Sequence, residues 1–209
     1  MAPPMDKYDC KKAHKELYTP TTKAFVFVDV PELTYIAVDG HGNPNTSPEY
    51  ADAVEALYAV AYTLKFTSKK TQGRDFVVAP LEGLWRASDM DAFVGGDKDD
   101  WAWTMMIAQP DWITGADIEQ AHATAAGKKN LPALDLLRPV TFTEGRSVQI
   151  LHIGAYDDEA PTLARLHDEF MPEHGLTFNG DHHEIYLSDA RKTVPSKLRT
   201  ILRQPVCSA

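Results

Sequence analysis

Short runs of hydrophobic residues, bounded by proline, glycine or asparagine, alternate along this chain with longer stretches that have helical spacing. Bounded apolar runs are typical of β-strands, whereas apolar residues that recur every three to four positions predict amphipathic helices. A charged segment at 6–18 is expected to form a helical arm that lies on the body. We expect strands at 24–30, 33–39, 76–86, 101–109, 148–154, 183–187 and 197–205, and helices at 48–66, 115–127 and 158–171.

Local signals mark several boundaries of these elements. Pro31 is expected to end the first strand, because proline cannot donate a ladder hydrogen bond. Ser47 followed by Pro48 is typical of a helix start, and Thr114 and Asp117 have the spacing of a capping box. Residues 87–100 form an acidic, glycine-containing stretch, which we expect to be a hairpin loop that could act as a lid.

The order strand–helix–strand–strand occurs twice, which indicates two copies of one supersecondary unit. The last strand of each unit ends in Gln-Pro, at Gln109 and Gln204, and the strand before it carries an acid, Glu82 or Glu184. The predicted fold class is α+β: a tandem pseudo-two-fold repeat forming a mostly antiparallel sheet, with the helices on one face and a ligand groove on the other. We expect one domain over 1–209, with an N-terminal arm at 1–23 and half-repeats at about 24–130 and 140–206.

The composition narrows the class of protein. A net charge of −9 argues against nucleic acid as a partner, since binding it depends on neutralising phosphates. No apolar run approaches the roughly 20 residues of a membrane span, and the first residues do not read as a signal peptide. Cys10 and Cys207 lie near opposite ends without disulfide or zinc spacing. We therefore expect a cytoplasmic protein, and its oligomeric state stays open.

Glu82 and Glu184 are the candidates for chemistry, because an unpaired carboxylate is costly to bury among apolar residues. Their matching positions predict that both face one groove. Side chains alternate along a strand, so Glu184 shares a face with Tyr186, and Trp103 shares one with Met105. Trp85 has the opposite parity to Glu82 and would reach the same groove only through a bulge at Gly83. For these aromatic residues, ordinary core packing is the alternative.

No metal or cofactor is expected. His152, His182 and His183 do not have the spacing of a metal motif, and the acidic stretch Asp89–Asp100 does not fit the calcium-loop pattern.

Four motifs carry a resemblance to a known family. The chain resembles the stand-alone GyrI-like small-molecule-binding proteins over about residues 6–206, in Leu33–Pro44, Ala79–Trp85, Trp101–Pro110 and His183–Asp189. The resemblance implies the tandem fold and an aromatic groove around acidic residues. It makes Glu184 and Glu82 the acidic pair. The groove walls it implies are Trp85, Trp103, Tyr156 and Tyr186, with Met105 beside them. The chain departs from the common pattern at Ala155 and Arg86, where relatives often have proline and tryptophan.

The resemblance also implies a function. Some stand-alone members are cyclopropanoid cyclopropyl hydrolases, which detoxify flat DNA-alkylating compounds by adding water across a strained ring. We expect such a hydrolase, with Glu184 as the general base and with Glu82 or a tyrosine hydroxyl orienting the water or supporting the phenolate. One alternative is a non-catalytic multidrug-binding module for cationic aromatic ligands, like the effector-binding domains of drug-sensing regulators. A second alternative is a protein-interaction module of the gyrase-inhibitor type.

Overall fold

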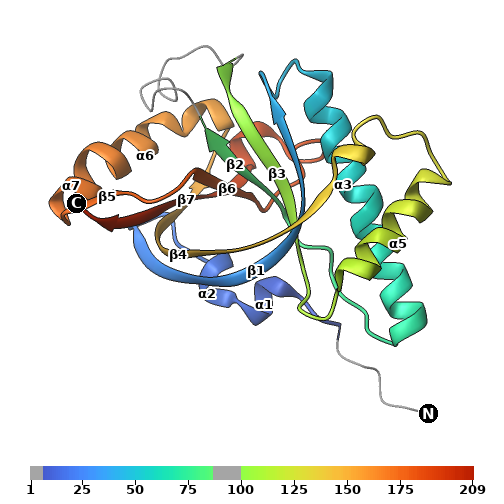
Figure 1. Ribbon diagram of the computed structural model, residues 1–209. Coiled ribbons are helices and arrows are strands. Elements are labelled where there is room, and N and C mark those ends of the chain that lie inside the picture. Colours follow the sequence, from blue (N-terminus) through green and yellow to red (C-terminus); the bar gives the residue numbers. More distant parts are fainter. Residues whose placement is uncertain (1–6, 87–99) are drawn as a thin grey trace.

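The computed structural model describes residues 7–86 and 100–209 (Figure 1). Most of the expected acidic loop at 87–100 therefore lies outside the described residues. The strands are β1 (Val26–His41), β2 (Leu81–Arg86), β3 (Ala102–Gln109), β4 (Arg138–Ile153), β5 (Leu176–Phe178), β6 (His182–Tyr186) and β7 (Arg199–Ser208). The α-helices are α1 (Cys10–Ala13), α2 (Lys15–Tyr18), α3 (Pro48–Thr67), α5 (Gly115–Ala126), α6 (Ala160–Ala164) and α7 (Met171–Glu173). Shorter 3₁₀- or π-helical segments are η1 (Ser68–Gln72), η3 (Leu134–Leu136), η4 (Tyr156–Asp158), η5 (Arg165–Phe170) and η6 (Pro195–Lys197).

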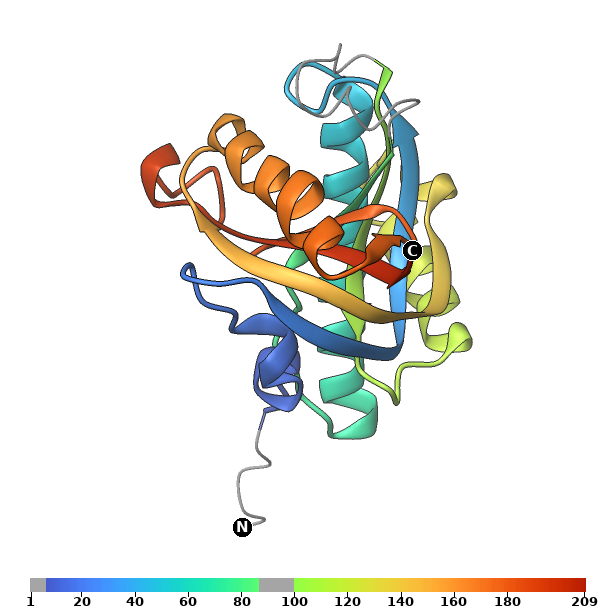
Figure 2. The same cartoon turned by 90° about the vertical axis from the view of Figure 1, so that its left-hand side faces the viewer.

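The strands form one antiparallel sheet that closes on itself. Their order is β4-β1-β3-β2-β6-β7-β5, and a further pairing of β4 with β7 completes a barrel-like ring. β1 and β4 are long and strongly curved, and they pair with each other along most of their length (Figures 1 and 2). The strand–helix–strand–strand order recurs in β1-α3-β2-β3 and in β4-α6-β6-β7, with the short strand β5 inserted before β6 in the second half. The predicted α+β fold class with its mostly antiparallel sheet is confirmed.

Helices α3 and α6 cover the outer face of this sheet. Leu163 of α6 packs on Ile150 of β4 and Leu202 of β7. Tyr50 of α3 contacts the ring of Trp103, on β3. Both long helical segments therefore lie on one face, as expected, and the other face is the interior of the closed sheet.

Several of the expected element boundaries are wrong. The strand expected at 76–86 begins only at Leu81, as β2, and the helix expected at 158–171 is divided into α6, η5 and α7. The runs on either side of Pro31 form the single strand β1, whose register with β4 passes over the proline, so one missing donor does not end the strand. β4 begins at Arg138, well before the strand expected at 148–154, because it pairs with β1 around the curve. The helix that starts at Pro48 and the capping box of Thr114 and Asp117 are both present.

The interior of the sheet holds a buried network of charged side chains. His183 contacts Glu82 Oε2 through Nε2 at 3.0 Å and Glu144 Oε1 through Nδ1 at 2.9 Å. Arg203 donates to Glu144 Oε2 at 3.0 Å and to Gln149 Oε1 at 3.0 Å. All of these side chains are buried. Two acidic side chains thus face two basic ones in the interior.

The N-terminal arm docks on this network, in agreement with its expected place on the body. Tyr18 donates its hydroxyl to Glu82 Oε1 at 3.0 Å. The backbone carbonyls of Glu16 and Leu17 accept from Gln149 and Arg203, both at 2.9 Å. Figures 1 and 2 both place α1 and α2 beside β1 at one end of the sheet. The arm therefore satisfies polar groups that the barrel alone would leave unpaired.

The network shifts the pKa values of His183 and Glu144. Burial opposes a charge on His183, but the adjacent Glu144 and hydrogen bonds to Glu144 and Glu82 raise the pKa of His183 to about 9. Burial likewise opposes a charge on Glu144, yet His183 and Arg203 lower the pKa of Glu144 to about 2. Both groups are therefore charged at neutral pH.

These shifts predict how stability depends on pH. The stabilisation from His183 is fully present below its ordinary pKa of 6.5 and is lost as the pH rises through about 9. The stabilisation from Glu144 is present above its ordinary pKa of 4.5 and is lost as the pH falls towards about 2. Urea unfolding should thus show a maximum between these two ordinary values and a loss on the order of 3 kcal/mol by alkaline pH.

A His183→Gln variant serves as the control for this measurement. It should be less stable at mildly acidic pH and should lose much less on going to alkaline pH. An alkaline decline of the same size in the variant would show that His183 is not its source.

Candidate functional site

The register between β2 and β6 decides which residues can form a site. Gly83 lies directly opposite Glu184, whereas Glu82 lies opposite Ile185. Residues that face each other across an antiparallel pair share a side of the sheet. Glu184 therefore points to the outer, helix-covered face and Glu82 to the interior. The expectation that both acids face one groove is wrong.

The physical reason is a one-residue offset between the two halves. Two positions before Gln109, Ile107 pairs with Leu81, and two positions before Gln204, Leu202 pairs with Glu184. The counterpart of Glu184 in the first half is therefore Leu81. Because a shift of one residue moves a side chain to the other face, Glu82 falls among the interior charges. The face opposite the helices, where a ligand groove was expected, lines the interior of the closed sheet.

On the outer face, Glu184 is the last member of a chain of hydrogen bonds. Its side chain is 14% exposed, and its Oε2 accepts from the Tyr186 hydroxyl at 2.7 Å. The same hydroxyl accepts from Trp85 Nε1 at 3.0 Å. The indole thus orients the phenol, and the phenol orients the carboxylate.

Gly83 makes this arrangement possible without a bulge. β2 pairs with β3 without interruption from Leu81 to Arg86, so the expected bulge is absent. Trp85 has the parity of Glu184, and its indole lies over Gly83. A Cβ at Gly83 would be 2.9 Å from Trp85 Nε1 and 3.1 Å from Met105 Sδ. Only glycine leaves room for the indole to reach Tyr186.

Aromatic rings from both halves surround the carboxylate. Tyr50 of α3 stacks on Trp85, with ring centroids 6.3 Å apart and 25° between the planes. From η4, Tyr156 meets Tyr186 edge-on at 5.7 Å and is 38% exposed. We call Glu184, Tyr186, Trp85, Tyr50 and Tyr156 the Glu184 cluster.

Two expected wall residues lie beneath the cluster rather than in it. Trp103 and Met105 are 1% and 0% exposed. Trp103 packs under the edge of Tyr50 and over Gly40. We infer that these two residues support the walls and do not touch a ligand.

The electrostatics of the cluster are those of a negative charge among neutral donors. Burial, followed by the nearby charge of Glu184, raises the pKa of Tyr156 to about 12 and holds that of Tyr186 well above its ordinary value. The pKa of Tyr50 is raised for the same two reasons. These phenols therefore keep their protons at neutral pH. Among the described residues, no lysine or arginine forms an ion pair with Glu184.

Sequence reasoning missed three residues of this region. Tyr50 was indistinguishable from the rest of the apolar stripe of α3, and His182 was considered only as a metal ligand. Glu159 precedes α6 and resembles an ordinary helix-start acid, yet it is 4% exposed. Its charge contributes to the raised pKa of Tyr156 and Tyr186, so it lies near both. Only the closed sheet brings these positions together.

The described residues show neither a metal site nor a membrane-spanning helix. In the part of the chain that the structure describes, no group of three histidine, cysteine or acidic residues lies close enough to hold a metal ion. In the same residues, no helix is long and apolar enough to cross a membrane.

Solved structures with a similar fold include three from Listeria innocua. One, an uncharacterized conserved protein, is 40% identical with a TM-score of 0.87, and the match covers 96% of this chain and 100% of that one. Two described as hydrolases are also 40% identical, with TM-scores of 0.83 and 0.84, covering 96% and 97% of this chain and all of theirs. The EcmrR C-terminal domain shares the fold at 9% identity and a TM-score of 0.54, covering 89% of this chain and 98% of its own.

The chain has no significant match among curated protein sequences. A family model for the GyrI-like small molecule binding domain matches residues 23–206, which include both halves of the sheet and every member of the Glu184 cluster. The chain therefore belongs to the GyrI-like family of small-molecule-binding domains.

Proposed function

We propose that the Glu184 cluster binds flat aromatic electrophiles and adds water to a strained cyclopropane ring that they carry. The observation that carries this proposal is a half-buried carboxylate, held by a tyrosine hydroxyl and lined by rings from both halves. Aromatic faces favour a flat ring system by stacking. A fixed carboxylate without a cationic partner is suited to act as a general base.

The reaction needs only water and the substrate. In a spirocyclopropyl dienone, the water oxygen attacks a cyclopropane carbon while Glu184 takes one water proton. The bond between that carbon and the spiro carbon breaks, and its electron pair moves through the dienone to the oxygen, which becomes a phenolate. The phenolate then takes up a proton, so the product is a hydroxyethyl phenol.

The tyrosines have separate roles in this scheme. Tyr186 keeps its proton, donates a hydrogen bond to Glu184 and so fixes the position of the base. Tyr156 is half-exposed and keeps its proton to high pH, so it is the donor we assign to the developing phenolate. The expected role of Glu82 passes to this tyrosine, because Glu82 is engaged in the interior. That two relatives at 40% identity are described as hydrolases supports a hydrolytic reaction.

Passive binding of cationic aromatic molecules is the second candidate. It is favoured by the absence, in the described residues, of a lysine or arginine paired with Glu184, since a ligand cation can supply the missing charge. Turnover separates the two candidates: a passive binder retains the dye or drug unchanged.

Replacing Glu184 with glutamine tests the proposed base. The change keeps shape and hydrogen bonding but removes the base, so hydrolysis of a spirocyclopropyl cyclohexadienone should fall by about 10²–10⁴. Affinity for the neutral substrate should be nearly unchanged because the rings remain. Product formation is followed by liquid chromatography, with Glu119→Gln on the exposed side of α5 as the control. Wild-type rates in the Glu184 variant would remove Glu184 from the mechanism.

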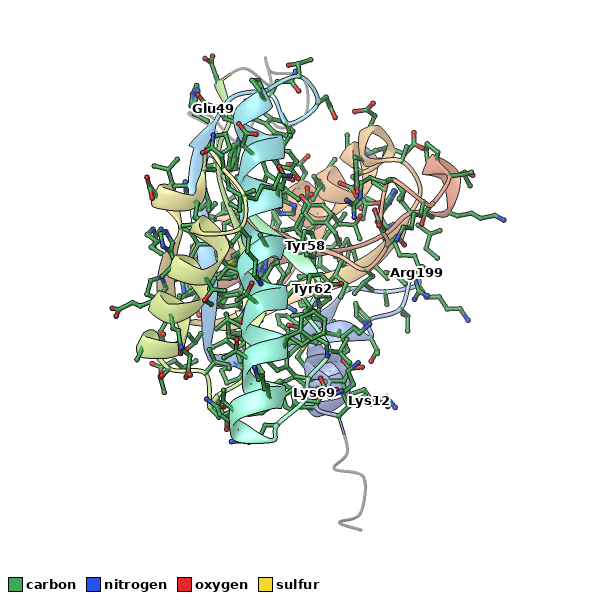
Figure 3. All side chains as sticks on the ribbon, turned by 90° about the vertical axis from the view of Figure 1, so that its right-hand side faces the viewer. Lys12, Glu49, Tyr58, Tyr62, Lys69 and Arg199 are labelled. Carbon is green, nitrogen blue, oxygen red and sulfur yellow. The ribbon has the colours of Figure 1, made fainter. Side chains whose placement is uncertain are left out.

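Replacing Tyr186 with phenylalanine tests the hydrogen-bonded chain. Without the hydroxyl, both Trp85 Nε1 and Glu184 lose a partner, so the base is held less firmly. We expect kcat to fall by about tenfold, a loss close to one hydrogen bond to a charged group. The matched control is Tyr62→Phe, since Tyr62 projects from α3 and is 48% exposed (Figure 3). Equal rates for the two variants would exclude a role for the hydrogen bonds that link Trp85, Tyr186 and Glu184.

A further inference from the structure

The imidazole of His182 lies behind the carboxylate of Glu184. The two residues are separated by one position on β6, so both point to the outer face. His182 Nε2 is 3.6 Å from Glu184 Oε1, while Tyr186 occupies the other carboxylate oxygen. The His182 side chain is 1% exposed, against 14% for Glu184. The imidazole is thus reached from the protein side and the carboxylate from the side open to a ligand.

The groups around His182 and Glu184 determine which of them can bind a proton. His167 of η5 approaches His182 with ring centroids 6.4 Å apart. Burial and the nearby His182 lower the pKa of His167 to about 4, so His167 stays neutral near neutral pH. Trp85 lies opposite His182 on β2 and does not titrate.

The groups that face Glu184 from the other elements would not accept a proton from its carboxyl group. Tyr50 of α3, Tyr156 of η4 and Tyr186 all keep their hydroxyl protons, for the reasons given above. Glu159, before α6, is the other nearby charge, and as a carboxylate it favours a cation in this region. His182 is thus the neighbour of Glu184 best placed to accept a proton.

A base that removes a proton from water has to release it before the next turnover. A ligand stacked among the rings covers the exposed side of Glu184. We propose that His182 is the proton acceptor of Glu184, a positioning residue that takes up the proton from the carboxylate and so restores its charge. The proton passes from water to Glu184 and then to His182 Nε2, which returns it to solvent after the phenol leaves. The 3.6 Å separation is an ion-pair distance and not yet a hydrogen bond, and catalytic contacts that are long without ligand often tighten when one binds.

The proton transfer during turnover rests on the proposed function, but the first test of the inference does not need a substrate. The ring nitrogens of His182 are followed by nuclear magnetic resonance at one fixed pH in the wild type, in Glu184→Gln and in the exposed control Glu169→Gln. The His182 signals are assigned by their loss in His182→Gln. Replacing the adjacent carboxylate should change the chemical shift of His182 Nε2, which reports its tautomer and its contact with Glu184, and the control should not change it. An unchanged Nε2 shift in Glu184→Gln overturns the coupling.

The second test measures the transfer itself. In His182→Gln the proton has to leave to bulk base, so kcat for the spirocyclopropyl dienone should fall at least about tenfold with KM nearly unchanged. The variant rate should then rise with imidazole buffer concentration at fixed pH, whereas the wild-type rate should not. His174→Gln, on the exposed end of α7, controls for loss of a histidine. A slow variant without buffer dependence, or a variant as fast as the wild type, overturns the transfer.

The two tests fail separately. An inactive wild type contradicts the proposed hydrolase function, while the resonance experiment still decides whether His182 and Glu184 are coupled.

Discussion

Because side chains alternate along β-strands, the pairing of β2 with β6 sends two similar glutamates to opposite faces of one sheet. Gly83, not Glu82, lies opposite Glu184. Glu184 is thereby placed under α3 and η4, among aromatic rings, and Glu82 is placed among interior charges. The same register sets Trp85 over Gly83, where its indole reaches Tyr186. A shift of one residue in β6 would turn Glu184 to the interior, on the same face as Glu82, and would remove both the site and the interior balance of charge.

The buried charge network in the interior holds β2 and β6 in this register. Burying a single charge is costly, and breaking a buried pair leaves the partner uncompensated. Glu82 is paired with His183 and Tyr18, and Arg203 links Glu144 to the arm. Glu82 and His183 lie on β2 and β6, so this pair connects the two strands on which the site is built. His183 and Glu184 are neighbours in sequence, one fixing the strand from inside and the other facing the ligand side.

The sequence predicted most of the fold because periodicity and caps are local signals. Pro48, the Thr114–Asp117 box and the alternation around Tyr186 each determine a conformation without help from distant residues. Glu184, Trp85, Tyr156 and Tyr186 were likewise recognisable as candidates. Register is a property of paired strands, so a lookalike motif around Glu82 could not reveal its one-residue offset. Tyr50 and His182 were missed for the same reason: their roles come from the elements that the closed sheet brings beside them.

Parallel measurement of stability and cation binding in Glu82→Gln and Glu184→Gln tests the division between the two acids most directly. Urea unfolding gives stability, and fluorescence titration with ethidium, a flat cation, gives affinity. Glu82→Gln should lose about 3–5 kcal/mol of stability, as expected when a buried charge is left unpaired, while its folded fraction binds the dye like the wild type. Glu184→Gln should stay within about 1 kcal/mol of the wild-type stability and bind the dye at least about tenfold more weakly. The reverse pattern, with Glu184 needed for stability and Glu82 for binding, would contradict the account.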